Sequence, residues 1–327
     1  MIIAPVNLRS RISLVSAGAF MSEKFFGKEA VIHKETKWAK QIISMQRRDG
    51  AWGDFHTLSG SSNSPLTTER ALQRLERLGF TIKDECIERA IFYMSDCLSG
   101  KREIPDRREK LVDWDMFTSL ILSTWIRRFT KDVPIANQVA GQWGDVISQA
   151  FHHGAYAHED YIAAYQEVFG GKTRGARLIK FVSFYTISLV QGCLDKGVEE
   201  ALMDYVLNLE DGIHYIYEER LTVLPPVFAS KQTSHYLAAI ELLTKYRHAA
   251  YKLQFVVDWL NGLKNENGKW DMGKSANDKV YFPLSDNWRK QETREADCTE
   301  RIMYLLSELS RDGSALEKYY GKRRRTP

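Results

Sequence analysis

The sequence predicts an all-helical (all-α) fold, and three observations lead to this prediction. Apolar residues recur with helical spacing along nearly the whole chain; Ile302, Leu305 and Leu309, for example, share one helical face. No segment has the alternating pattern of a half-buried strand, and no hairpin turn joins two such segments. Finally, a unit made of a helix, a tight turn, a loop and a second helix occurs twice.

The periodicity divides the chain into about ten to twelve helices. Their approximate spans are 10–21, 35–47, 66–79, 84–98, 115–130, 134–151, 158–169, 174–194, 197–219, 234–247, 249–264 and 297–310. Gly79 ends one helix, because glycine readily adopts the left-handed conformation of a helix C-terminus. Pro134 begins another, since a first-turn residue needs no backbone donor. The Pro225–Pro226 pair interrupts the stretch before 234.

The chain of 327 residues is slightly longer than most single hydrophobic cores. We expect a helical extension at 1–30, one domain over 31–315 and a basic tail at 316–327. The net charge of +4 is small and lies largely in the tail, so no nucleic-acid partner is expected. The four cysteines have no paired spacing, which favours reduced thiols and a cytoplasmic location.

The repeated unit is the strongest signal in the sequence. Residues 46–52 read Gln-Arg-Arg-Asp-Gly-Ala-Trp, and residues 264–270 read Lys-Asn-Glu-Asn-Gly-Lys-Trp. Each copy follows a helix and leads through a loop to a helix that opens with Thr-Glu-Arg, at 68–70 and at 299–301. The tryptophan-to-threonine step is 16 residues in the first copy and 29 in the second, so the second loop is 13 residues longer (29 − 16). Units of this kind predict a closed ring of helix pairs, with the last unit packed beside the first.

The glycines and tryptophans of the repeat have a structural interpretation. Gly50 and Gly268 permit a turn that a Cβ atom would obstruct. Trp52 and Trp270 each supply a large apolar ring whose indole N–H can hold a backbone carbonyl. We therefore expect both tryptophans to be buried and to stabilise the fold.

The pattern Gln-x-x-x-Gly-x-Trp resembles the repeat motif of the squalene and oxidosqualene cyclases, which has weaker forms in protein prenyltransferase β subunits. Gln46, Gly50 and Trp52 match it in full, whereas the second copy has Lys264 at the first position. Asp297-Cys298-Thr299 is similar to the segment that follows such a motif in oxidosqualene cyclases and holds the catalytic acid. The resemblance implies an (α/α)6-type toroid, a barrel of inner and outer helices.

The resemblance also implies a function, namely a terpene cyclase-like or prenyltransferase-like protein that holds an isoprenoid or other apolar substrate in a central cavity. Asp297 would donate the proton that starts a cationic cyclisation, which requires a dry site that keeps the acid neutral. An N-cap role ahead of Thr-Glu-Arg is the alternative for Asp297. Aromatic side chains would stabilise the cation. The candidates for this apolar wall are Phe117, Trp125, Phe184, Tyr185, Tyr236, Tyr281, Phe282 and Trp288, together with His235.

Two further clusters have residue types suited to metal binding. Asp113 and Asp115 flank Trp114 at a helix start, where they could act in catalysis by holding Mg²⁺ against a diphosphate substrate or could simply favour the helix N-terminus. No other cofactor is expected. His152, His153 and His158 gather in one loop, but their spacing matches no zinc pattern.

The leading hypothesis is thus a toroid with an apolar small-molecule ligand; peripheral membrane association and a partner subunit are both compatible with it. Two alternatives stay open: a non-catalytic toroid that binds a protein or peptide, and a carbohydrate-active α/α-barrel enzyme that uses paired acids. We also expect the long 271–296 loop to form a rim of the site, because it carries Tyr281, Phe282 and Trp288 to Asp297.

Overall fold

The computed structural model describes residues 33–56, 66–110, 112–170 and 178–323. The described residues form α-helices, two short 3-10 turns and two isolated β-bridges, and they contain no β-strand, which confirms the all-α prediction. The α-helices are α2 (Lys37–Ser44), α3 (Thr68–Arg77), α4 (Glu85–Leu98), α5 (Trp114–Phe129), α6 (Pro134–Ala150), α7 (His158–Phe169), α8 (Phe184–Leu189), α9 (Lys196–Asn208), α10 (Lys231–Leu243), α11 (Ala249–Lys252), α12 (Gln254–Gly262) and α13 (Gln291–Arg323). Short 3-10 turns lie at η2 (His33–Glu35) and η4 (Lys274–Ala276). The expected extension at 1–30, with its helix at 10–21, lies outside the described residues.

Several helix boundaries differ from the prediction; the helix expected at 249–264, for example, is divided into α11 and α12. Of the helix expected at 174–194, residues 174–177 lie outside the described residues and residues 178–183 are not helical, so only α8 corresponds to it. The N–H of Phe184 donates to the carbonyl of His214 at the start of α8. The helix expected at 197–219 ends at Asn208, where the chain enters a tight turn at Gly212. A Cβ atom there would collide with the carbonyl oxygens of residues 217 and 219. The last helix begins at Gln291 rather than at 297 and continues through the boundary expected at 315.

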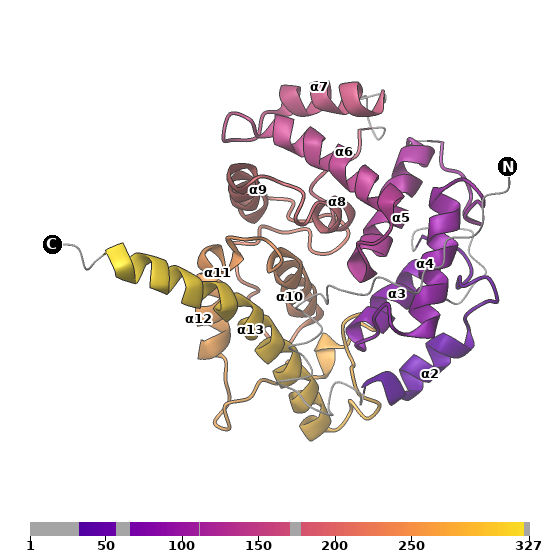
Figure 1. The fold of residues 1–327 in the computed structure, drawn as a ribbon. Coiled ribbons are helices and arrows are strands. Elements are labelled where there is room, and N and C mark those ends of the chain that lie inside the picture. The colour runs from indigo at the N-terminus through magenta and orange to yellow at the C-terminus, as the bar shows by residue number, and fades with distance from the viewer. Residues whose placement is uncertain (1–32, 57–65, 111, 171–177, 324–327) are drawn as a thin grey trace.

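Helices adjacent in sequence pack side by side, with α5 between α4 and α6, and α6 against α7 (Figure 1). α8 also packs on α5, and α11 and α12 pack on α13. The beginning of the described chain meets the first part of α13 and the loop before it: His33 Nε2 lies 2.9 Å from Glu300 Oε2, and the N–H of Lys37 donates to Asp286 over 3.0 Å. Among the described residues, no helix is both long enough and apolar enough to cross a membrane.

Both copies of the repeat make the same contacts. The indole N–H of Trp52 donates to the carbonyl of Ile42, and that of Trp270 to the carbonyl of Leu260, each over 2.7 Å. The backbone N–H groups of the two tryptophans donate to the hydroxyls of the threonines of the two Thr-Glu-Arg segments, over 2.9 Å to Thr68 at the start of α3 and 3.1 Å to Thr299 within α13. The rings are 1% and 2% exposed, which confirms the expectation that they are buried.

The two glycines of the repeat differ in their surroundings. Both have positive φ angles, +95° at Gly50 and +71° at Gly268. A Cβ atom at Gly50 would collide with the carbonyl of Arg89 on α4, whereas none of the described atoms lies within 4 Å of a Cβ atom at Gly268. Gln46 reinforces the first turn, because its amide donates to the carbonyls of Gly50 and Cys86.

The long loop expected at 271–296 ends at residue 290, where α13 follows, and its apolar residues pack inside the protein. Tyr281 lies between two guanidinium groups, with ring-centre distances of 4.8 Å to Arg77 and 5.2 Å to Arg301. Both arginines form ion pairs with Glu241. Arg74 donates to the carbonyls of residues 280 and 283. Three helices, α3, α10 and α13, are therefore joined through this loop.

Candidate functional site

The N-terminal end of α3 is positioned by the first copy of the repeat. Thr67 caps the helix, and its hydroxyl accepts from the N–H of Arg70 over 3.3 Å. The carboxylate of Asp106 accepts from the N–H groups of Phe55 and His56 over 2.6 and 2.7 Å. Asp106 is buried, and burial raises its pKa against these two hydrogen bonds, which lower it. Asp106 thus fixes the backbone at Phe55 and His56, where the side chain of His56 meets that of Glu69.

Glu69 is the centre of a buried polar cluster formed by His56, Glu69, Trp125 and Tyr185, hereafter the Glu69 cluster. One carboxylate oxygen accepts from the Tyr185 hydroxyl over 2.6 Å and from the Trp125 indole over 3.1 Å. The other lies 2.9 Å from Nδ1 of His56. Glu69 and Tyr185 are each the second residue of their helices, α3 and α8, while Trp125 comes from the middle of α5.

The contacts within the Glu69 cluster shift the pKa values of Glu69 and Tyr185. Burial by itself would raise the pKa of Glu69, but its contacts with His56, Tyr185 and Trp125 outweigh burial and lower that pKa to about 2. Burial and the neighbouring carboxylate hold the pKa of Tyr185 well above its usual value. Because an ionised carboxylate only accepts hydrogen bonds, the proton of a neutral His56 lies on Nδ1. The described residues offer Nε2 no hydrogen-bond partner, so its lone pair is available for a ligand.

Aromatic rings surround the imidazole of His56. The ring of Phe117 meets it edge to face at a centroid distance of 5.2 Å, and Tyr215 does so at 6.2 Å. Tyr215 also lies 5.2 Å from Tyr185, adopts a φ of 71° and is 42% exposed. Only a few per cent of residues other than glycine adopt such a backbone conformation. The cluster is therefore bordered by apolar rings, one of which reaches solvent.

Four of the predicted aromatic residues thus lie at or beside this cluster: Phe117, Trp125 and Tyr185, and Phe184, whose ring contacts those of Trp125 and Tyr185. The predicted acids Asp113 and Asp115 are not part of it. Asp113 caps α5, with its carboxylate accepting from the N–H of Met116 over 3.3 Å. Asp115 is exposed and pairs with Arg108 over 2.7 Å. Helix capping and a surface ion pair are the observed contacts of these two acids.

The remaining predicted aromatic residues lie around α10 and the long loop. Tyr236 is fully buried and donates to the carbonyl of Leu221 over 3.0 Å. Nδ1 of His235 lies 3.2 Å from the carbonyl oxygen of Ile216, and its ring meets Tyr281 edge to face. Phe282 is fully buried and stacks on Trp288 at a centroid distance of 5.4 Å. The sequence-predicted residues therefore fall into two groups, one at the Glu69 cluster and one around the loop.

Asp297 holds the end of that loop. One carboxylate oxygen accepts from the N–H groups of Leu284 and Ser285 over 2.8 and 2.9 Å, and the other from the Ser285 hydroxyl over 2.6 Å. The side chain is 1% exposed, and burial raises its pKa against these hydrogen bonds, which lower it. The observed contacts of Asp297 are those of a residue that fixes a backbone turn.

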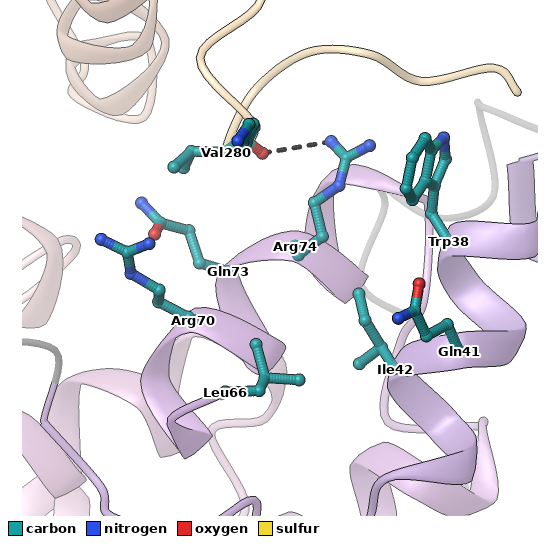
Figure 2. Close-up of a pocket in the computed structure, with 9 residues that line it drawn as sticks. Trp38, Gln41, Ile42, Leu66, Arg70, Gln73, Arg74 and Val280 are labelled. Atoms are coloured by element: carbon teal, nitrogen blue, oxygen red, sulfur yellow. Dashed lines mark hydrogen bonds between the residues drawn. The ribbon is translucent and has the colours of Figure 1, made fainter. Parts of the chain in front are cut away.

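A small cavity lies between α2, α3 and the long loop (Figure 2). Its volume is about 180 Å³, and Figure 2 shows Arg74 donating to the carbonyl of Val280 at its edge. The lining residues are Trp38, Gln41, Ile42, Leu66, Arg70, Gln73, Arg74, Lys279 and Val280. The cavity is lined by α3 residues that follow Glu69 in sequence, and none of the Glu69 cluster lines it.

Sequence reasoning missed His56 and Glu69 as site residues. Glu69 belongs to the repeated Thr-Glu-Arg segment, and its counterpart Glu300 also contacts a histidine, His33. A glutamate placed twice at the same position of the sequence repeat, each time with a histidine before it in the chain, was the available signal. The partner histidines lie 13 residues before Glu69 and 267 residues before Glu300, so spacing alone does not reveal the pairs.

No family model, curated protein or solved structure matches this chain. The candidate site therefore rests on its own geometry.

Proposed function

We propose that the chain is an α/α-toroid protein that binds an apolar ligand beside the Glu69 cluster, where His56 acts as a general base. The observation that carries this proposal is the buried His56–Glu69 contact of 2.9 Å inside a border of aromatic rings. A carboxylate bound to one imidazole nitrogen orients the ring and stabilises its protonated form, so the other nitrogen can take a proton from a ligand.

The acid–base properties of histidine favour proton transfer from the ligand to His56 over transfer from His56 to the ligand. An imidazolium is far too weak an acid to protonate an isolated alkene, so His56 does not suit acid-initiated cyclisation. It suits removal of a proton from a carbocation or from an activated carbon or hydroxyl group. The aromatic faces of Phe117 and Tyr215 would stabilise positive charge on such a ligand.

Several observations support the toroid. The start of the described chain is joined to α13 and to the loop before it by the contacts of His33 with Glu300 and of Lys37 with Asp286. The tryptophans of the two repeat copies make equivalent hydrogen bonds, as expected for a repeated unit of helix pairs. Side chains from the first turns of α3, α5 and α8 also converge on one site, which is expected if these are inner helices running in the same direction.

The binding proposal is tested by equilibrium dialysis with farnesol, an isoprenoid alcohol. We expect saturable binding to the wild-type chain and at least tenfold weaker binding to Tyr215→Asn, since asparagine tolerates the left-handed backbone but removes the ring. Tyr251→Asn is the matched control, because Tyr251 is 76% exposed on α11. Equal affinity of the wild type and Tyr215→Asn, or no saturable binding by the wild type, would contradict the proposal.

The role of His56 is tested separately by incubating the wild type and His56→Gln with farnesol and farnesyl diphosphate and analysing products by mass spectrometry. We expect product from the wild type and at least a hundredfold less from His56→Gln, with farnesol affinity retained. Binding without turnover in the wild type would identify a binding protein and remove the general-base role. Equal turnover by both chains would place the chemistry elsewhere.

A further inference from the structure

The junction between α6 and α7 brings three metal-ligating side chains together. His152 and His153 directly follow the end of α6, and Asp160 is the third residue of α7. α6 and α7 pack against each other, and the loop between them is short, so the aspartate returns to the two histidines. This group is unrelated to the Glu69 cluster, and the proposed function does not use it.

The geometry of the group suits a metal ion. One ligand atom from each of His152, His153 and Asp160 lies within 4.8 Å of the other two. The two imidazole rings are adjacent, with centroids 3.6 Å apart. Nδ1 of His152 lies 2.6 Å from the carbonyl oxygen of Gln149 and 3.6 Å from a carboxylate oxygen of Asp160. A histidine that donates to a carbonyl through Nδ1 keeps the lone pair of Nε2 for a metal.

We propose that His152, His153 and Asp160 form a binding site for a divalent transition metal ion of the zinc type. Two imidazoles and one carboxylate are ligands that Zn²⁺, Cu²⁺ and Ni²⁺ prefer, whereas Mg²⁺ and Ca²⁺ prefer all-oxygen sites. With metal–ligand bonds of about 2.0–2.2 Å, tetrahedral ligand atoms lie about 3.3 Å apart. Both histidines are exposed and Asp160 is half-buried, so rotation about their side-chain bonds can close the 4.8 Å spread.

The charge of the site and its neighbours agree with this assignment. Two neutral imidazoles and one carboxylate bring one negative charge to the ion, and Glu159 adds a second acidic group on the same helix turn. His158 is nearby in sequence, but its Nδ1 lies 2.8 Å from the Tyr156 hydroxyl. His158 therefore serves as an internal control, and three protein ligands leave a fourth position for water.

The site is tested by isothermal titration calorimetry of the full chain with Zn²⁺ and, separately, with Mg²⁺. We expect one equivalent of Zn²⁺ to bind, no detectable binding of Mg²⁺, and a visible absorption spectrum typical of tetrahedral coordination when Co²⁺ is used. His153→Ala and Asp160→Asn should each weaken Zn²⁺ binding at least tenfold, whereas His158→Ala should leave it unchanged. Circular dichroism of each variant verifies that the exposed substitutions leave the fold intact.

Two results would overturn the assignment. If the wild type binds no Zn²⁺, the side chains do not close around an ion. If His153→Ala or Asp160→Asn binds Zn²⁺ as tightly as the wild type, the ion is held by other groups. Loss of binding in His158→Ala alone would also contradict the proposed ligand set.

Discussion

Replacement of Glu69 by glutamine tests the electrostatics of the buried cluster most directly. The substitution preserves the size of the side chain and its ability to accept hydrogen bonds from Trp125 and Tyr185, but it removes the negative charge. Glu300 provides a matched control, because it occupies the equivalent position of the second repeat and also contacts a histidine, but its side chain is 38% exposed. A difference in unfolding free energy between Glu69→Gln and Glu300→Gln therefore measures the effect of the burial of Glu69 and of its additional hydrogen bonds.

The magnitude follows from the pKa of Glu69. A shift from 4.5 to about 2 corresponds to about 3 kcal/mol of stabilisation, at about 1.4 kcal/mol per pKa unit. Because the folded-state pKa is below the unfolded one, this stabilisation is fully present above pH 4.5 and is lost as the pH falls towards 2. At pH 7, Glu69→Gln should lower the free energy of unfolding by about 3 kcal/mol, and Glu300→Gln by about 1 kcal/mol or less.

The assay is urea unfolding of the three chains, followed by far-ultraviolet circular dichroism at pH 7 and at pH 3. We expect the difference in unfolding free energy between the wild type and Glu69→Gln to narrow at pH 3, because Glu69 is then largely protonated in the unfolded chain but still ionised in the folded one. Equal costs of Glu69→Gln and Glu300→Gln at pH 7 would refute this reasoning. A gap between the wild type and Glu69→Gln that does not change with pH would also refute it.

Three other predictions concern the repeat and the long loop. Trp52→Phe and Trp270→Phe should each lower the free energy of unfolding by about 1–3 kcal/mol in urea titrations, because each leaves a buried carbonyl without its indole donor. Gly50→Ala should be clearly more destabilising than Gly268→Ala by thermal unfolding, since only the first Cβ atom would meet a backbone carbonyl; similar melting temperatures would contradict this. Tyr281→Ala should cost about 3–5 kcal/mol in urea unfolding, in keeping with a buried ring between two arginines, and a loss below 1 kcal/mol would show that the loop is not part of the core.

Much of the fold could be predicted because its determinants are local. Helical periodicity depends on residues three and four apart, and the two Gly-x-Trp turns depend on a few consecutive residues. The prediction was wrong where a local pattern competes with a distant contact. Residues 209–219 have helical periodicity, yet the chain turns at Gly212, and the N–H of Phe184 bonds to the carbonyl of His214.

Less of the candidate site could be predicted. Phe117 and Trp125 were named as aromatic candidates and lie at the Glu69 cluster, since large aromatic residues on helices are commonly buried. Asp297 was singled out by its resemblance to a catalytic segment, but its carboxylate accepts three hydrogen bonds from the 284–285 turn. The acid and the turn that it holds are separated by about a dozen residues, and their pairing depends on the path of the long loop.

By itself, the sequence determined that this chain is helical, that it contains two equivalent turn units, and that Trp52 and Trp270 are buried. Each of these features is decided by the chemistry of neighbouring residues and by helical period. Only the tertiary structure decided that Glu69 meets His56, Trp125 and Tyr185, which are 13, 56 and 116 residues away. Such contacts depend on how whole helices pack, because a rotation of α5 or α8 about its axis would direct the same residues elsewhere without changing the helical pattern of the sequence.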